Sequence, residues 1–234
     1  TDYLAHLNPG SEILAIDISK GALAIAIERL RRSGGIDQSR LSFENRSIFD
    51  LKNEGKFDYI NSVGVLHHLS DPLAGLKALG SLLKTGSILH LFIYADAGRW
   101  EIKRVQQALN RMGVLTEKNE LQLARELFNN LPKNNHLRRN HEERWSVECE
   151  SDANFADMYL DPKEITYNLE ELFTLIRNSG LEFVSFSNPK IWSLDRLLKG
   201  ELLERARSFS YIEQMELVED LDSDISHFEL FLSK

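Results

Sequence analysis

The sequence has little cysteine, no long apolar run and a shortage of positive charge. The single cysteine, Cys149, excludes an intramolecular disulfide and a cysteine-based metal site, and it favours a reducing compartment such as the cytoplasm. No apolar run approaches the ~20 residues of a membrane helix. Acidic residues outnumber basic ones, 36 to 28, for a net charge of -8. That balance argues against nucleic acid or an anionic membrane surface as the main partner.

Strand-like and helix-like segments alternate over the first 97 residues. Apolar residues make up 42% of the chain of 234 residues, which is enough for a packed core. Strands are predicted within 12–17, 40–51, 56–69 and 86–98, and helices follow the first and third of them. The run 12–17 is apolar throughout, as in a parallel strand that is covered on both faces. This alternation predicts a doubly wound α/β sheet.

The pattern changes after residue 97. Two amphipathic helices are predicted over 99–115 and 117–131, and residues 132–162 show no clean period. A helix, a strand, several short helices and a last strand over 226–232 complete the chain. We therefore expect a core made of residues 1–97 and 160–234, and a helical insertion, residues 98–159, that covers the substrate.

A carboxylate stands at the tip of the first predicted strand. Asp17 follows "EILAI", and Ser19 begins the next helix. Ligands of open α/β sheets bind at the carboxyl ends of the strands, where an acid can accept hydrogen bonds from both hydroxyls of an adenosine ribose. An acid there can equally be a charge at a helix N-terminus, and it would serve a nicotinamide dinucleotide as well.

Residues 57–94 carry a series of more specific motifs. The strand opens with Phe57-Asp58, a Val-Leu-His-His-Leu turn with Asp-Pro runs from Val65 to Pro72, and a Leu-Leu-Lys-x-Gly turn ends at Gly86. In order and spacing, this series resembles class I S-adenosylmethionine-dependent methyltransferases of the type 11/12-like domain. The resemblance implies a Rossmann-like, mostly parallel sheet with an antiparallel last strand, and S-adenosyl-L-methionine as the cofactor.

The resemblance also implies positions for the cofactor. Asp17 matches the acid that binds the ribose, and Ile18 lies beside the adenine. The family's usual acid for the adenine amino group is replaced by Ser47, so Asp50 is the expected partner, with Ile48 packing on the ring. Asn61, Ser62 and Val63 are expected beside the methionine half of the cofactor.

The family's glycine-rich loop is not in this sequence. Such a loop lies roughly 20 residues before the ribose acid, which is further than the chain extends from Asp17. We therefore expect that the first strand is missing here and that the chain alone is inactive.

No catalytic residue is assigned from the sequence. His67 and His68, with Asp71, suggest acid–base chemistry, but a structural turn is favoured. Tyr94, Arg99 and Trp100 stand where the insertion leaves the sheet, and we expect them to orient a small-molecule acceptor. Two alternatives stay open: a nicotinamide-dependent oxidoreductase, and a non-catalytic binding module on the same fold.

Overall fold

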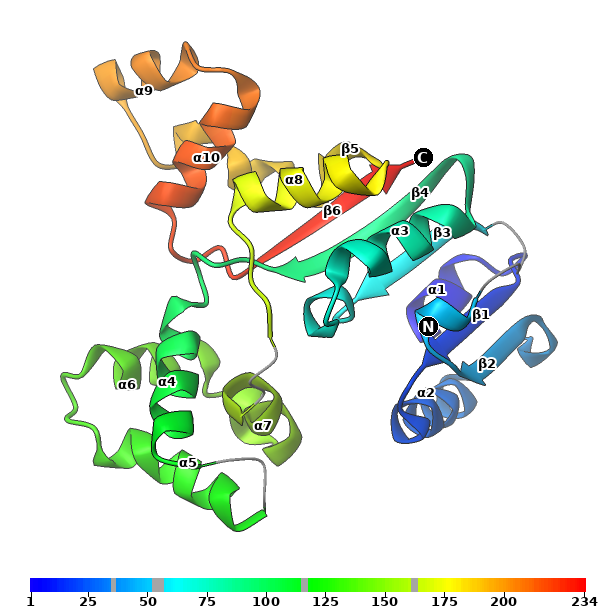
Figure 1. Cartoon of the computed structure of the whole chain (residues 1–234), viewed down its shortest axis with the longest axis horizontal. Helices are drawn as coiled ribbons and strands as arrows, with labels where there is room; N and C mark the ends of the chain where they lie inside the picture. Colours follow the sequence, from blue (N-terminus) through cyan, green and yellow to red (C-terminus); the bar gives the residue numbers. More distant parts are fainter. Residues whose placement is uncertain (35–36, 52–56, 115–117, 161–163) are drawn as a thin grey trace. The chain divides into compact units, whose positions relative to one another are not determined.

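The computed structural model describes residues 1–34, 37–51, 57–114, 118–160 and 164–234 (Figure 1). The chain divides into two compact units, Thr1–Phe57 and Asp58–Lys234, here called the N-terminal and C-terminal units. Among the described helices, none combines the length and the apolarity of a membrane span.

The N-terminal unit is a short parallel sheet with two helices. It contains α1 (Asp2–Leu7), β1 (Ile13–Asp17), α2 (Lys20–Ser33) and β2 (Leu41–Asn45), with 3-10 turns η1 (Gln38–Arg40) and η2 (Ile48–Asp50). β1 and β2 run parallel, with Asp17 opposite Asn45. Helix α2 begins where predicted, because the Ser19 hydroxyl accepts a hydrogen bond from the backbone N–H of Ala22 (3.2 Å).

One expectation about this sheet is corrected. Every residue of β1 is half-buried, so the strand is not covered on both faces as its apolar sequence predicts. β1 has only β2 as a strand neighbour among the described residues.

The C-terminal unit contains a four-stranded mixed sheet. Its strands are β3 (Phe57–Val63, which begins at the boundary of the units), β4 (Leu83–Tyr94), β5 (Glu182–Phe186) and β6 (His227–Ser233), in the order β3-β4-β6-β5. β6 runs antiparallel to both of its neighbours. The associated helices are α3 (Pro72–Leu82), α8 (Leu169–Ser179), α9 (Gly200–Arg207) and α10 (Tyr211–Leu221). The predicted α/β class and the antiparallel last strand are confirmed.

Between β4 and α8 the named elements are all helical, and the described residues between them form turns and one isolated bridge that joins Ala95 to Tyr167. This segment contains α4 (Trp100–Arg111), α5 (Lys118–Asn130), α6 (His136–Asn140), a π-helical turn η4 (His141–Trp145), η5 (Glu148–Glu150) and α7 (Asp152–Leu160). Within the stretch 132–162, where the sequence shows no period, the described residues 132–160 are therefore mostly helical. Its helices are short, so few turns are available to display a period.

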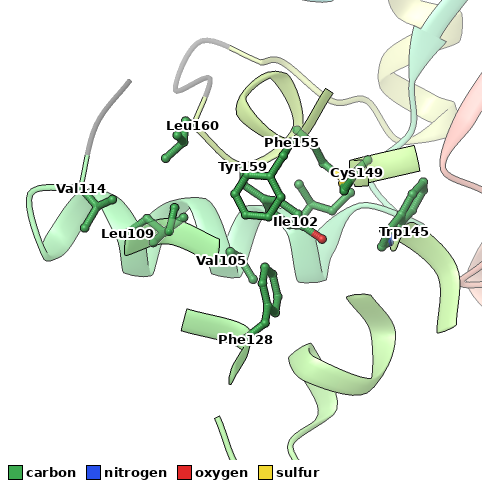
Figure 2. Close-up of a cluster of buried hydrophobic side chains, with 12 residues drawn as sticks. Ile102, Val105, Leu109, Val114, Phe128, Trp145, Cys149, Phe155, Tyr159 and Leu160 are labelled. Carbon is green, nitrogen blue, oxygen red and sulfur yellow. The ribbon is translucent and has the colours of Figure 1, made fainter. Parts of the chain in front are cut away.

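The helical segment has an apolar core of its own (Figure 2). Ile102, Val105 and Leu109 of α4 contribute one side, and Phe128 of α5 and Phe155 of α7 pack with them, each at most 5% exposed. Cys149 is buried in the same cluster, and burial raises the pKa of its thiol to about 11. The cysteine is therefore a core residue and a poor nucleophile at neutral pH.

Candidate cofactor and acceptor sites

The tip of β1 holds a carboxylate in a fixed position. Oδ1 of Asp17 accepts the backbone N–H of Ser19 (2.7 Å), and the backbone carbonyl of Asp17 accepts the Asn45 side-chain amide (2.9 Å). Oδ2 of Asp17 has no hydrogen-bond partner among the described residues. The arrangement leaves one carboxylate oxygen open at the carboxyl end of a parallel strand, as a ribose-binding acid requires.

The other candidates of the N-terminal unit lie near this tip. The Asn45 amide also donates to the backbone carbonyl of Ile18 (2.9 Å), whose side chain is 80% exposed. Asp50 ends η2, where its Oδ2 accepts the backbone N–H of Ser47 (3.1 Å) in a capping box. Ile48 is half-buried in the same turn. An adenine role for Asp50 therefore depends on its other carboxylate oxygen.

The three candidates on β3 do not face one way. Side chains alternate along a strand, so Asn61 and Val63 share one face and Ser62 points to the other. Asn61 Oδ1 is 2.5 Å from His90 Nδ1 on β4, while the Ser62 hydroxyl is buried and has no hydrogen-bond partner in the described part of the chain. Val63 is 48% exposed. At most two of these residues can therefore line one surface through their side chains.

Tyr94, at the end of β4, is stacked between two other candidate residues. The His67 ring lies 3.8 Å from the Tyr94 ring centroid, and the Arg99 guanidinium carbon lies 3.6 Å from it. Two groups this close to one centroid must occupy opposite faces of the ring. The stack fixes the phenol at the carboxyl end of a strand, and burial raises its pKa.

The Arg99 guanidinium is already engaged by a carboxylate. Its Nε and Nη2 donate to the two oxygens of Glu164 at 2.6 and 2.7 Å, and both side chains are nearly fully buried. Burial raises the pKa of Glu164 despite this ion pair. Arg99 is thus held as a clamp on Tyr94, and its planar fork is not available to a ligand carboxylate in this arrangement.

His67 is the most unusual side chain of the C-terminal unit. It is fully buried, and neither ring nitrogen has a hydrogen-bond partner among the described residues. Burial, aided by the charges of His68 and Arg99, lowers its pKa to about 3. The imidazole is therefore neutral at physiological pH, and its place in the stack agrees with the structural role favoured from the sequence.

Sequence reasoning missed Glu164 entirely. It lies 65 residues from Arg99 in the chain, and no motif surrounds it. Trp100, in contrast, stands where predicted, at the start of α4 with 42% of its surface exposed.

Comparison with known proteins identifies the domain. Residues 1–89 match the family model of a methyltransferase domain. Over 99% of its length the chain superposes on the structure of PKMT2 from Rickettsia typhi in complex with AdoHcy, with a TM-score of 0.77 at 18% identity. Residues 1–89 of this chain carry a methyltransferase domain. Its Rossmann-like fold is thereby confirmed, and the family is S-adenosylmethionine-dependent.

Two curated relatives of the methyltransferase domain differ in extent. A protein of Synechococcus sp., described as uncharacterized, is 49% identical over 100% of this chain and 57% of its own length. The ubiquinone biosynthesis O-methyltransferase of Xanthomonas campestris is 34% identical, over 35% of this chain and 34% of its own length. The chain thus spans about half of the Synechococcus protein, and also 46% of PKMT2.

Proposed function

We propose that the protein containing this chain transfers a methyl group from S-adenosyl-L-methionine to a small-molecule acceptor in the cytoplasm. The carbon–sulfur bond of the sulfonium breaks, its electron pair stays on sulfur, and the methyl bonds to a nucleophile of the acceptor. An acceptor that carries a proton on that nucleophile loses it to a base or to water. Because the sulfonium is already a good electrophile, the protein mainly supplies proximity and orientation.

The observation that carries this proposal is the Asp17 carboxylate. Ser19 and Asn45 fix the tip of β1, and the second carboxylate oxygen of Asp17 remains available to accept a hydrogen bond from a ribose hydroxyl. Ile18 offers an exposed apolar surface directly beside it. We assign Asp17 to the ribose, Ile18 and Ile48 to the adenine, and Asp50 to its amino group. The assignment of Asn61, Ser62 and Val63 to the methionine half stays a prediction from the sequence.

The acceptor side of the proposal uses the end of β4. Tyr94 offers a phenol whose ring is held between His67 and Arg99. A rigid aromatic ring of this kind supports orientation of an acceptor. The helical insertion begins at the next helix and, in this proposal, covers the acceptor while transfer takes place.

Calorimetry on the full-length protein tests the assignment of Asp17. We expect Asp17→Ala to weaken binding of S-adenosylhomocysteine by about 1.5–3 kcal/mol, the scale of hydrogen bonds to a charged group. Asp37→Ala is the matched control, because Asp37 makes the same local bond, from its Oδ1 to the backbone N–H two residues later (2.9 Å). Unchanged affinity in Asp17→Ala would exclude the ribose role.

The same titration distinguishes the nicotinamide alternative. The family match favours methyl transfer, so we expect NAD to bind at least tenfold more weakly than S-adenosylhomocysteine. Tighter binding of NAD would overturn the proposed function. Binding of neither ligand would favour a non-catalytic module.

A further inference from the structure

A groove lies between α4 and the start of α6, within the helical segment. Trp100, Arg104, Gln107, Ala108 and Arg111 line it from α4, and Asn135, His136 and Leu137 line it from the start of α6. The cavity measures about 340 Å³, within the range of small-ligand pockets. Both elements belong to the C-terminal unit.

Two arginines in this groove have no acidic partner. Most arginines of the C-terminal unit pair with carboxylates: Arg99, Arg125, Arg138, Arg144, Arg196, Arg205 and Arg207. Among the described residues, Arg104 and Arg111 make no ion pair and no side-chain hydrogen bond, and both are exposed. In a chain with a net charge of -8, two unpaired guanidiniums in one groove form a local site for anions.

The spacing of the two arginines describes the ligand. They stand seven residues apart on one helix, so they share a face, and their Cα atoms lie roughly 10.5 Å apart along its axis. Ala108 between them is small and leaves the floor of the groove open. One compact anion does not span that distance, whereas carboxylates three residues apart on a polyproline II segment lie on one side about 9.3 Å apart.

The remaining lining residues suit a peptide. Trp100 is 42% exposed one turn before Arg104, and its ring is tilted on that of His136 with a centroid distance of 5.6 Å. Gln107 has no hydrogen-bond partner among the described residues, so its amide can donate to and accept from a peptide backbone, which a polyproline II segment leaves unpaired. Asn135 uses only its side-chain oxygen, for the backbone N–H groups of Leu137 and Arg138.

We infer that this groove binds an extended acidic peptide segment, with two carboxylates three residues apart on Arg104 and Arg111 and an apolar side chain on Trp100. Nucleic acid fits less well, because its affinity is built from many phosphate contacts and the groove offers two free arginines. The groove shares no residue with the proposed cofactor site, so the inference does not depend on methyl transfer.

The test is fluorescence polarisation with the full-length protein and a short labelled peptide carrying two glutamates three residues apart and one tryptophan. A second peptide of the same composition has its glutamates adjacent. We expect the first peptide to bind at least fivefold more tightly. Each of Arg104→Ala and Arg111→Ala should weaken it about fivefold, the upper range for an exposed ion pair, and the double variant about 25-fold.

Arg29→Ala is the matched control, since Arg29 is exposed and makes no ion pair with any described residue, but lies on α2 of the N-terminal unit; it should leave the affinity unchanged. Equal binding of the two peptides would overturn the inference. So would displacement of the peptide by pyrophosphate or a single-stranded oligonucleotide at lower concentration than by unlabelled peptide. S-adenosylhomocysteine affinity, measured on the same variants, should stay unchanged, which separates this result from the proposed function.

Discussion

The two sheets of the molecule bury their apolar residues very differently. In β1 every residue is half-buried, although Ile13, Leu14, Ala15 and Ile16 form one apolar run. In β6, Phe228, Leu230 and Leu232 alternate with positions that are not fully buried, and all three are 0% exposed. The strand with the more apolar sequence is thus the less protected one.

The difference shows that burial is decided by the neighbours of a strand and not by its composition alone. β6 lies between β4 and β5, and Phe228 stacks with Trp192 (5.9 Å) beneath the sheet. β1 has a single strand neighbour among the described residues. The N-terminal unit also leaves Ile18, Ile25 and Ile27 at least 47% exposed. The C-terminal unit should therefore be the more stable of the two.

The largest expected effect comes from matched truncations in the two sheets. Phe228→Ala removes a fully buried ring and should lower the free energy of unfolding by about 3–5 kcal/mol. Ile16→Ala in β1 should cost about 1 kcal/mol, because that side chain is only half-buried. Urea unfolding, with hydrogen exchange of the β1 and β6 amides, measures both. Equal losses would remove the difference between the sheets.

Much of this architecture could be predicted from local signals. Ser19 marks the start of α2, Asn168 caps α8, and the alternation in β6 identifies its buried face. These features depend on residues within a few positions of one another. Asp17 was named as a candidate in the same way, because a strand tip followed by a helix cap is a local pattern.

The acceptor side could be predicted only in part, because its contacts join distant segments. Tyr94 and Arg99 were named from their position, but the partner of Arg99 is Glu164 and the second face of Tyr94 is covered by His67. These pairings are set by tertiary packing, which no short pattern records. The Arg99 guanidinium, which the sequence suggested as a group for binding the acceptor, is paired with Glu164 of the same chain.

The second prediction concerns acid, and it applies to the C-terminal unit. The pKa of His67 is lowered from 6.5 to about 3, so below pH 6.5 the unfolded chain binds the proton more readily. The contribution of the neutral His67 ring to the free energy of unfolding should be fully present above pH 6.5. It should fall toward pH 3, by on the order of 3 kcal/mol.

His67→Phe tests this, because it keeps an aromatic ring against Tyr94 and removes the proton. In the variant, the free energy of opening measured by hydrogen exchange of the β4 and β6 amides should depend less on pH. His6→Phe, which replaces an exposed imidazole of the N-terminal unit, is the control and should leave that dependence in place. An unchanged slope in His67→Phe would show that other groups carry the acid sensitivity.

The smallest expected effect has the opposite sign and also belongs to the C-terminal unit. Oε2 of Glu219, on α10, accepts a hydrogen bond from the backbone N–H of Leu169 (2.9 Å), while Oε1 is buried and finds no partner among the residues that the structure describes. Burial raises the pKa of this carboxyl from 4.5 to about 7, despite that hydrogen bond. The folded state therefore binds the proton more readily between pH 4.5 and 7, and stability falls as the pH rises through that window.

Glu219→Gln keeps an acceptor for Leu169 without the charge, so it should stabilise the protein at pH 8 by on the order of 1 kcal/mol and be neutral at pH 4. Glu171→Gln is the control, because Glu171 lies at the exposed cap of α8, the helix that begins at Leu169. A gain that persists at pH 4 would mean that the amide packs better for reasons unrelated to charge.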